Sequence, residues 1–354
     1  MFKGSIGFHF ALSVLNRYSI PDVLDLTGDA TKAFSSFDFK RVWINDNLEY
    51  RNVLVALAAL VSRYDVQIGT AVAVPYVRNP IDLASGIASL SELRPGRRIG
   101  LGLGAGSGSL TGQKIELIDR MEVVEETARF LRLLFDGNET NIIDYPSLTS
   151  YFHFKANSFK LRFSPKAEVD LQYGFSGLGT NTTSMIARLF DGTILQTRLL
   201  TIPEMEEMMV RLDEARAHER ISKKLSKVLM LNASVSRNAE RALDGGKRFV
   251  SQIVASSSSK LLKRRGILPT EYESLKEKFS KNEGLGPAAE LTSDSLVKKV
   301  LVAGTPNEVI EKISAFFKFA EKFGYEEVMI GPPLGPDPSE VIDIWAREIL
   351  PSVL

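Results

Sequence analysis

Short apolar runs alternate with amphipathic stretches along the whole chain. The runs have the length of buried strands, and the stretches between them repeat apolar residues at helical spacing. The runs lie at residues 5–10, 41–46, 66–74, 97–106, 169–177, 192–198, 227–236 and 326–333. Because a predicted helix follows each run, we expect parallel strands joined by right-handed crossovers. Eight such units predict an α/β fold, a (β/α)8 TIM barrel formed by one domain over residues 1–354.

Two segments interrupt this alternation. Residues 136–168 follow the fourth unit and are rich in turn formers and aromatic residues. Residues 238–304 contain several helical pieces between the seventh and eighth strands. We expect both to be insertions, after strands 4 and 7, on the face of the barrel where the strands end. That face carries the active site in enzymes of this fold.

Composition narrows the class of protein. Lys and Arg total 44 against 43 Asp and Glu, and this balance argues against a general nucleic-acid-binding protein. No run approaches the roughly 18 apolar residues of a membrane span. The absence of cysteine and the presence of only three, widely spaced histidines argue against a metal site. We therefore expect a cytoplasmic protein that acts on a small molecule, without nucleic acid or membrane as a partner.

The stretch RRIGLGLGAG (97–106) looks at first like a dinucleotide-binding loop. In a Rossmann domain, however, such a loop follows the first strand, whereas this one belongs to the fourth unit. Gly100, Gly102, Gly104 and Gly106 alternate, so they share one face of the predicted strand. That face leaves room for a flat group near the mouth of the barrel. A tight packing layer inside the barrel is the alternative.

Three ordered stretches resemble a known family. They are WINDNLEYRNVLVALAAL (43–60), the segment GTAVAVPYVRNP to GLGAG (69–106), and GTPNEVIEKI (304–313) with GPPLGPDPSEVIDIWAREILP (331–351). Together they resemble the bacterial-luciferase-like superfamily of flavin- or deazaflavin-binding barrels. Within it, YRNVLV, PYVRNP and GPPLGPD are most similar to the coenzyme F-420-dependent 5,10-methylenetetrahydromethanopterin reductases. The resemblance implies a homodimeric oxidoreductase that transfers a hydride between coenzyme F-420 and an organic substrate, with methylenetetrahydromethanopterin as the leading substrate.

The resemblance also implies where the cofactor lies. A bulge with a cis peptide after the third strand would support the ring, and the matching bond is Ala71–Val72. The loop after the fifth strand would bind the cofactor phosphate through backbone N–H groups ahead of a helix. Capping of that helix by Thr180 or Asn181 is the alternative. The predicted cofactor-binding residues are Asp46, Asn47, Ala71, Val72, Ala73, Gly104, Ala105, Gly106, Ser176, Gly177, Leu178 and Gly179.

Two places depart from the family pattern. Where relatives have Asp-His after strand 2 the chain has Asp46-Asn47, and where reductases have a glutamate near the end of strand 1 it has His9. We predict all three as catalytic, with Asp46 or Asn47 hydrogen-bonded to the ring and His9 as a proton donor. A packed strand residue is the alternative for His9. The alternative functions are an FMN-dependent luciferase-like monooxygenase and a flavin- or deazaflavin-binding protein without turnover.

Overall fold

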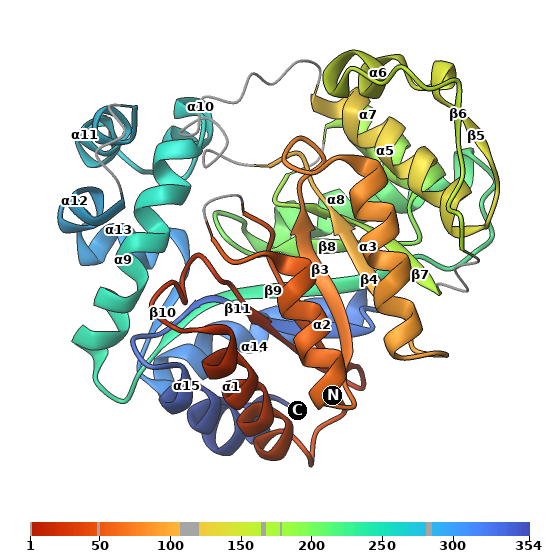
Figure 1. Ribbon diagram of the computed structural model, residues 1–354. Helices are drawn as coiled ribbons and strands as arrows, with labels where there is room; N and C mark the ends of the chain where they lie inside the picture. Colours follow the sequence, from red (N-terminus) through yellow and green to blue (C-terminus); the bar gives the residue numbers. More distant parts are fainter. Residues whose placement is uncertain (1, 48–49, 107–119, 164–167, 178, 281–284) are drawn as a thin grey trace.

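The computed structural model describes residues 2–47, 50–106, 120–163, 168–177, 179–280 and 285–354. In these ranges eight parallel strands close into a barrel, with β11 paired to both β9 and β1 (Figure 1). The strands in order around the barrel are β1 (Ser5–Phe10), β2 (Phe39–Ile44), β3 (Gln67–Ala73), β4 (Ile99–Leu103), β7 (Val169–Phe175), β8 (Gly192–Gln196), β9 (Ser226–Val235) and β11 (Glu327–Leu334). The predicted TIM barrel is confirmed.

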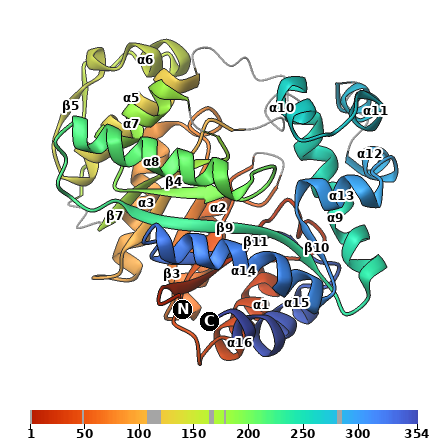
Figure 2. The ribbon, with the colours of Figure 1, turned by 180° about the vertical axis from the view of Figure 1, so that it is seen from behind.

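Helices cover the outside of the barrel, and Figure 2 shows α8 and α14 side by side over β9. Residues next to each start signal where several of these helices begin. Ser19 and Asp22 form a capping box at α1, and Thr305 and Glu308 form one at α14, so each pair satisfies backbone N–H groups of a first turn. The helices are α1 (Ile20–Ala33), α2 (Val53–Arg63), α3 (Pro80–Leu93), α5 (Arg120–Phe135), α7 (Thr180–Leu189), α8 (Ile202–His218), α14 (Pro306–Lys322), α15 (Pro338–Ile344) and α16 (Leu350–Val353), with the π-helical turn η2 (Trp345–Ile349) before α16.

The first insertion begins after helix α5 rather than directly after β4. It contains β5 (Thr140–Asn141), η1 (Ile142–Asp144), α6 (Pro146–Phe152) and β6 (Ser158–Phe159). Tyr151 of α6 packs edge-on against Tyr76, which follows β3, and donates a 3.2 Å hydrogen bond to the Tyr76 carbonyl oxygen. The insertion therefore reaches the face where the barrel strands end.

The second insertion follows β9 and is mostly helical. Figure 1 shows its helices gathered on one side of the barrel, away from α6. They enclose an apolar cluster of their own, which includes Val250, Val254 and Leu262. The elements are α9 (Ala239–Ser256), α10 (Ser259–Arg264), α11 (Pro269–Ser280), α12 (Leu285–Glu290), α13 (Asp294–Val300) and the short strand β10 (Val302–Gly304), which pairs with β9.

A buried indole fills the interior of the barrel. The ring of Trp43 lies where a Cβ atom at Gly69 would be 2.5 Å from it and one at Gly100 2.7 Å. Its Nε1 donates a 2.5 Å hydrogen bond to Glu327, and the guanidinium of Arg41 stacks 4.8 Å from the ring centroid. Burial raises the pKa of the Glu327 carboxyl despite the nearby Arg41. Gly100 thus belongs to a packing layer, as the alternative interpretation of the glycine run expected.

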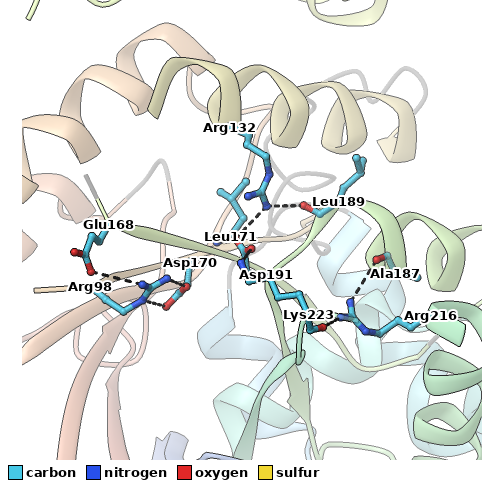
Figure 3. Close-up of polar contacts among 10 residues, drawn as sticks. All are labelled: Arg98, Arg132, Glu168, Asp170, Leu171, Ala187, Leu189, Asp191, Arg216 and Lys223. Carbon is cyan, nitrogen blue, oxygen red and sulfur yellow. Dashed lines mark hydrogen bonds and ion pairs between the residues drawn. The ribbon is translucent and has the colours of Figure 1, made fainter. Parts of the chain in front are cut away.

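Ion pairs join neighbouring strands at the opposite end of the barrel, where the strands begin (Figure 3). Arg98, just before β4, binds Asp170 of β7. Asp191, just before β8, accepts hydrogen bonds from Lys223 at 2.6 Å and Arg132 at 3.0 Å. Burial acts to raise the pKa of Asp191, but these two cations outweigh it and hold that pKa below its usual range. These pairs stabilise the end of the barrel away from the candidate site.

Within the described ranges, no helix is both long enough and apolar enough to cross a membrane.

Candidate functional site

A cavity of about 400 Å³ opens at the end of the barrel where the strands finish. The structure brings most of the predicted site residues to its wall. They are His9, Asp46, Asn47, Ala71, Val72, Gly104, Ala105, Gly106, Ser176 and Gly177. The agreement follows from the fold, because parallel strands deliver their carboxyl-end residues to one face.

Three predicted residues are not among those that line the cavity. Ala73 is fully buried in the main core, because the bulge in β3 shifts its register and turns this residue toward the helices. Gly179 occupies the N-cap position of α7. Leu178 lies outside the described residues.

The wall behind the cavity is formed by a bulge in β3 packed on two glycines. The Ala71–Val72 peptide is cis, as predicted. A Cβ atom at Gly104 would lie 2.8 Å from Val72 Cγ2, and one at Gly174 would lie 2.3 Å from Val72 Cγ1. Only glycine at these two positions admits the Val72 side chain. Because Gly104 and Gly106 follow β4 rather than lie within it, they line the cavity while Gly100 packs on the indole below.

Asp46 is tied to its surroundings by both oxygens. Arg78 donates from Nε to Oδ2 at 2.6 Å and from Nη2 to Oδ1 at 2.9 Å. The Asp46 side chain is 1% exposed, and its backbone N–H donates to the Val72 carbonyl at 3.1 Å. This ion pair fits a residue that positions the β3 bulge and presents a neutralised carboxylate to the cavity. Sequence reasoning missed Arg78, although it lies within the quoted motif PYVRNP, beside the helix cap Asn79.

His9 lines the cavity with both ring nitrogens lacking a hydrogen-bond partner among the described residues. Phe8 and Phe10 point to the other side of the strand, where Phe8 stacks on Phe34, the C-cap residue of α1. The imidazole is 2% exposed, and this burial lowers the pKa of His9 to about 3. At neutral pH the ring is therefore neutral, able to donate one hydrogen bond and accept another, and it carries no ionisable proton for acid catalysis.

The loop after β7 presents open backbone. Ser176 and Gly177 line the cavity, and a Cβ atom at Gly177 or Gly179 would meet nothing within 4 Å. Among the described residues no side chain caps α7, so capping by Thr180 or Asn181 is not what this loop provides. Uncapped N–H groups of a helix start suit an anion such as a phosphate.

Sequence reasoning also missed several polar residues of the cavity. Gln196 ends β8 and Arg198 follows it two positions later, whereas Gln252 comes from α9 of the second insertion. In the part of the chain that the structure describes, the guanidinium of Arg198 has no hydrogen-bond or ion-pair partner. Alternation along residues 192–198 was the available signal, because it places positions 194, 196 and 198 on one face.

Comparison with known proteins decides the family. The model of the luciferase-like monooxygenase family matches residues 14–321. The chain belongs to this family. It is 28% identical to 5,10-methylenetetrahydromethanopterin reductase of Archaeoglobus fulgidus over 327 aligned residues. The alignment covers 90% of this chain and 92% of the relative.

Solved structures agree on the fold of this luciferase-like protein. The coenzyme F-420-dependent tetrahydromethanopterin reductase of Methanopyrus kandleri superimposes with a TM-score of 0.77 at 18% identity, over 99% of both chains. A secondary alcohol dehydrogenase dependent on F-420, solved with an F-420–acetone adduct, gives a TM-score of 0.71 at 19% identity, again over 99% of both chains. The resemblance inferred from the sequence is confirmed.

The cavity of this luciferase-like chain suits a flat polar ring with an anionic substituent. Gly104, Gly106 and Gly174 leave bare backbone on its wall, and His9 offers unpartnered ring nitrogens. A concave site with a few convergent polar groups is typical of a cofactor pocket. Among the described residues, no group of His, Asp and Glu could hold a metal ion.

Proposed function

We propose that this protein is a coenzyme F-420-dependent oxidoreductase that transfers a hydride between the deazaflavin and an organic substrate. The observation that carries the proposal is the cavity wall, where Val72 packs on Gly104 and Gly174 and leaves a surface without bulky side chains. The relatives named above, two of which depend on F-420 by name, support the choice of cofactor.

The chain's own residues would then bind, orient and shield the reactants. Ala71 and Val72 support the ring, and the open backbone around Gly177 holds the phosphate. When bound, the deazaflavin supplies the two-electron hydride chemistry. His9 would donate a hydrogen bond rather than a proton, because its lowered pKa leaves no imidazolium at neutral pH. Asp46 holds the bulge through its backbone N–H, and Arg78 neutralises its carboxylate.

The leading substrate is methylenetetrahydromethanopterin, or a related one-carbon pterin. The Archaeoglobus fulgidus relative carries this substrate in its name and matches nine tenths of the chain. The alcohol dehydrogenase with a similar fold acts on a different kind of molecule, so the barrel does not determine the substrate.

Absorbance titration tests the proposal. The purified protein is titrated with coenzyme F-420 and, separately, with FMN. Reduced F-420 is then mixed with the protein and methylenetetrahydromethanopterin under argon. We expect F-420 to bind and its oxidised spectrum to return only when the pterin is present. Tight binding of FMN with oxygen-dependent turnover would support a monooxygenase instead, and F-420 binding without turnover on any acceptor would support a binding protein.

A homodimer and a cytoplasmic location remain part of the proposal. We infer that the contact would use α2 and α3, the helices after β2 and β3. One face of α2 packs on the barrel through Leu57 and Leu60, whereas Val55 on the same helix is exposed. Light scattering of the purified protein tests the dimer, and a monomeric mass at micromolar concentration would exclude it.

A further inference from the structure

We propose that Arg198, with Gln196 beside it at the end of β8, binds an oxyanion, a carboxylate or a phosphate, carried by the ligand in the cavity. The proposal rests on the proposed function in that the ligand is taken to be the cofactor or its substrate. None of the residues predicted from the sequence supplies this charge. Among the described residues Arg198 has no anionic partner, and the rest of the described cavity wall is nearly neutral.

The charge balance of the cavity favours an anionic ligand. Among its described lining residues, only Asp46 and Arg198 carry a full charge at neutral pH, because His9 is neutral. Arg78 neutralises Asp46 through two hydrogen bonds. The positive charge of Arg198 is therefore the one left uncompensated in this wall.

Arg198 is half-buried in the cavity wall, so its charge is incompletely solvated until an anion reaches it. Desolvation lowers the pKa of Arg198 to about 10, and no acidic group among the described residues acts in the other direction. A charge that has lost part of its hydration is stabilised by an anion paired with it. The guanidinium fork offers parallel N–H donors that match the two oxygens of a carboxylate or phosphate, and the amide of Gln196 adds another donor.

The loop that carries Arg198 is held in place by β9 and by the second insertion. The Arg198 N–H donates to Asn232 Oδ1 at 3.3 Å. Leu199, the next residue, adopts a φ of 55°, in the left-handed region that disfavours a leucine. Its N–H donates to the Val300 carbonyl at 3.1 Å, and Arg265 donates to its carbonyl. The insertion thus fixes an unfavourable backbone, which is the arrangement expected where a side chain must be aimed.

A neighbouring cavity offers a competing position for the anion. It has a volume of about 340 Å³, shares Ser13, Phe249 and Gln252 with the first cavity, and is lined by Arg248 of α9. Arg248 is exposed to solvent, so water already stabilises its charge. Arg198 is the better oxyanion site because its charge is the more poorly solvated, and Arg248→Met is a matched control.

The first experiment uses inorganic phosphate and cofactor-free protein. Phosphate that binds the folded state raises the melting temperature with concentration. We expect phosphate to protect the wild type and Arg248→Met, and to protect Arg198→Met at least tenfold more weakly. Arg198→Lys, which keeps the charge without the fork, should retain part of the effect. Equal protection of the wild type and a folded Arg198→Met would overturn the proposal, as would equal protection of the wild type and Arg198→Lys if Arg198→Met does not fold.

The second experiment identifies the source of the oxyanion. Dissociation constants are measured for coenzyme F-420 and for a phosphate-free deazaflavin, and KM is measured for methylenetetrahydromethanopterin. If Arg198→Met weakens F-420 binding at least tenfold and spares the phosphate-free deazaflavin, the oxyanion belongs to the cofactor. If only the KM for the pterin rises tenfold or more, it belongs to the substrate. Unchanged values for all three ligands, or equal losses in Arg248→Met, would overturn the proposal. Failure of the wild type to bind F-420 would contradict the proposed function alone, since the phosphate result stands without it.

Discussion

Arg78 holds Asp46 by two parallel hydrogen bonds, 2.6 Å from Nε to Oδ2 and 2.9 Å from Nη2 to Oδ1. The pair joins the loop after β2 to the loop that leads into α3. Because the Asp46 N–H also donates to the Val72 carbonyl, the ion pair is continuous with the wall of the cavity. A residue expected from the sequence to act on the cofactor is thus part of the framework that shapes its site.

Replacing Arg78 by methionine should destabilise the protein strongly. The Asp46 side chain is 1% exposed and that of Arg78 is 12% exposed, so the substitution leaves a buried carboxylate without its cation. Breaking such a pair costs about 3–5 kcal/mol. Urea unfolding at neutral pH measures the loss. The control is Arg347→Met, which removes an ion pair with Asp343 from a side chain that is 79% exposed, and such pairs contribute about 0–1 kcal/mol. Similar losses in the two variants would contradict this interpretation.

Histidine 9 should make the free energy of unfolding depend on pH. The pKa of His9 is about 3 in the folded protein against 6.5 ordinarily, because burial disfavours the charged ring. Between these values the unfolded chain binds a proton that the folded chain does not, so stability falls as the pH decreases below about 6.5, and it is constant above that value.

The expected slope is about 1.4 kcal/mol per pH unit in that window. His9→Gln cannot titrate, so the wild type should lose stability relative to this variant between pH 6 and pH 5. Urea unfolding of both proteins at pH 7, 6 and 5 provides the test. Parallel pH profiles would show that the imidazole is solvated and does not keep its low pKa. The same low pKa predicts no loss of turnover rate from His9 titration between pH 6 and pH 8.

Gly100→Val should destabilise the barrel without directly altering the cavity. A Cβ atom at this position would lie 2.7 Å from the Trp43 ring and 3.0 Å from Arg41, and both side chains are buried. Overpacking of this kind costs about 1–3 kcal/mol. Thermal or urea unfolding reports the loss, and near-ultraviolet circular dichroism should show a changed environment of the indole. A variant as stable as the wild type would mean that the layer can rearrange.

Gly177→Val should reduce cofactor affinity and leave the stability of the protein unchanged. Its Cβ atom would meet nothing within 4 Å, so stability should be unchanged. The added side chain would cover backbone N–H groups beside the cavity, and we expect the affinity for coenzyme F-420 to fall at least tenfold, about 1.4 kcal/mol. Titration with a phosphate-free deazaflavin is the control and should change much less. Equal losses for both ligands would assign the loop to packing rather than to phosphate binding.

Local sequence determined the eight strands and their order along the chain. Each strand is an apolar run followed by a helix, and several of these helices carry their own start signal, such as the capping boxes at Ser19 and Thr305. Parallel strands then place residues 46, 71 and 177 at one face, because every strand ends there. Fold, family and the approximate position of the site follow from these features, since all of them depend on residues close together in the chain.

Only the tertiary structure decided what the site residues contact. Arg78 reaches Asp46 across 32 positions, and Gly174 meets Val72 only because β7 lies beyond β4 in the closed barrel. Strand register selects which glycine packs on Trp43 and which lines the cavity. The neutral state of His9 depends on burial, and Arg198 comes to the cavity wall without an anionic partner among the described residues only once the barrel is closed. A side chain is removed from water by all the atoms around it, and these come together only when segments distant in the sequence pack against one another.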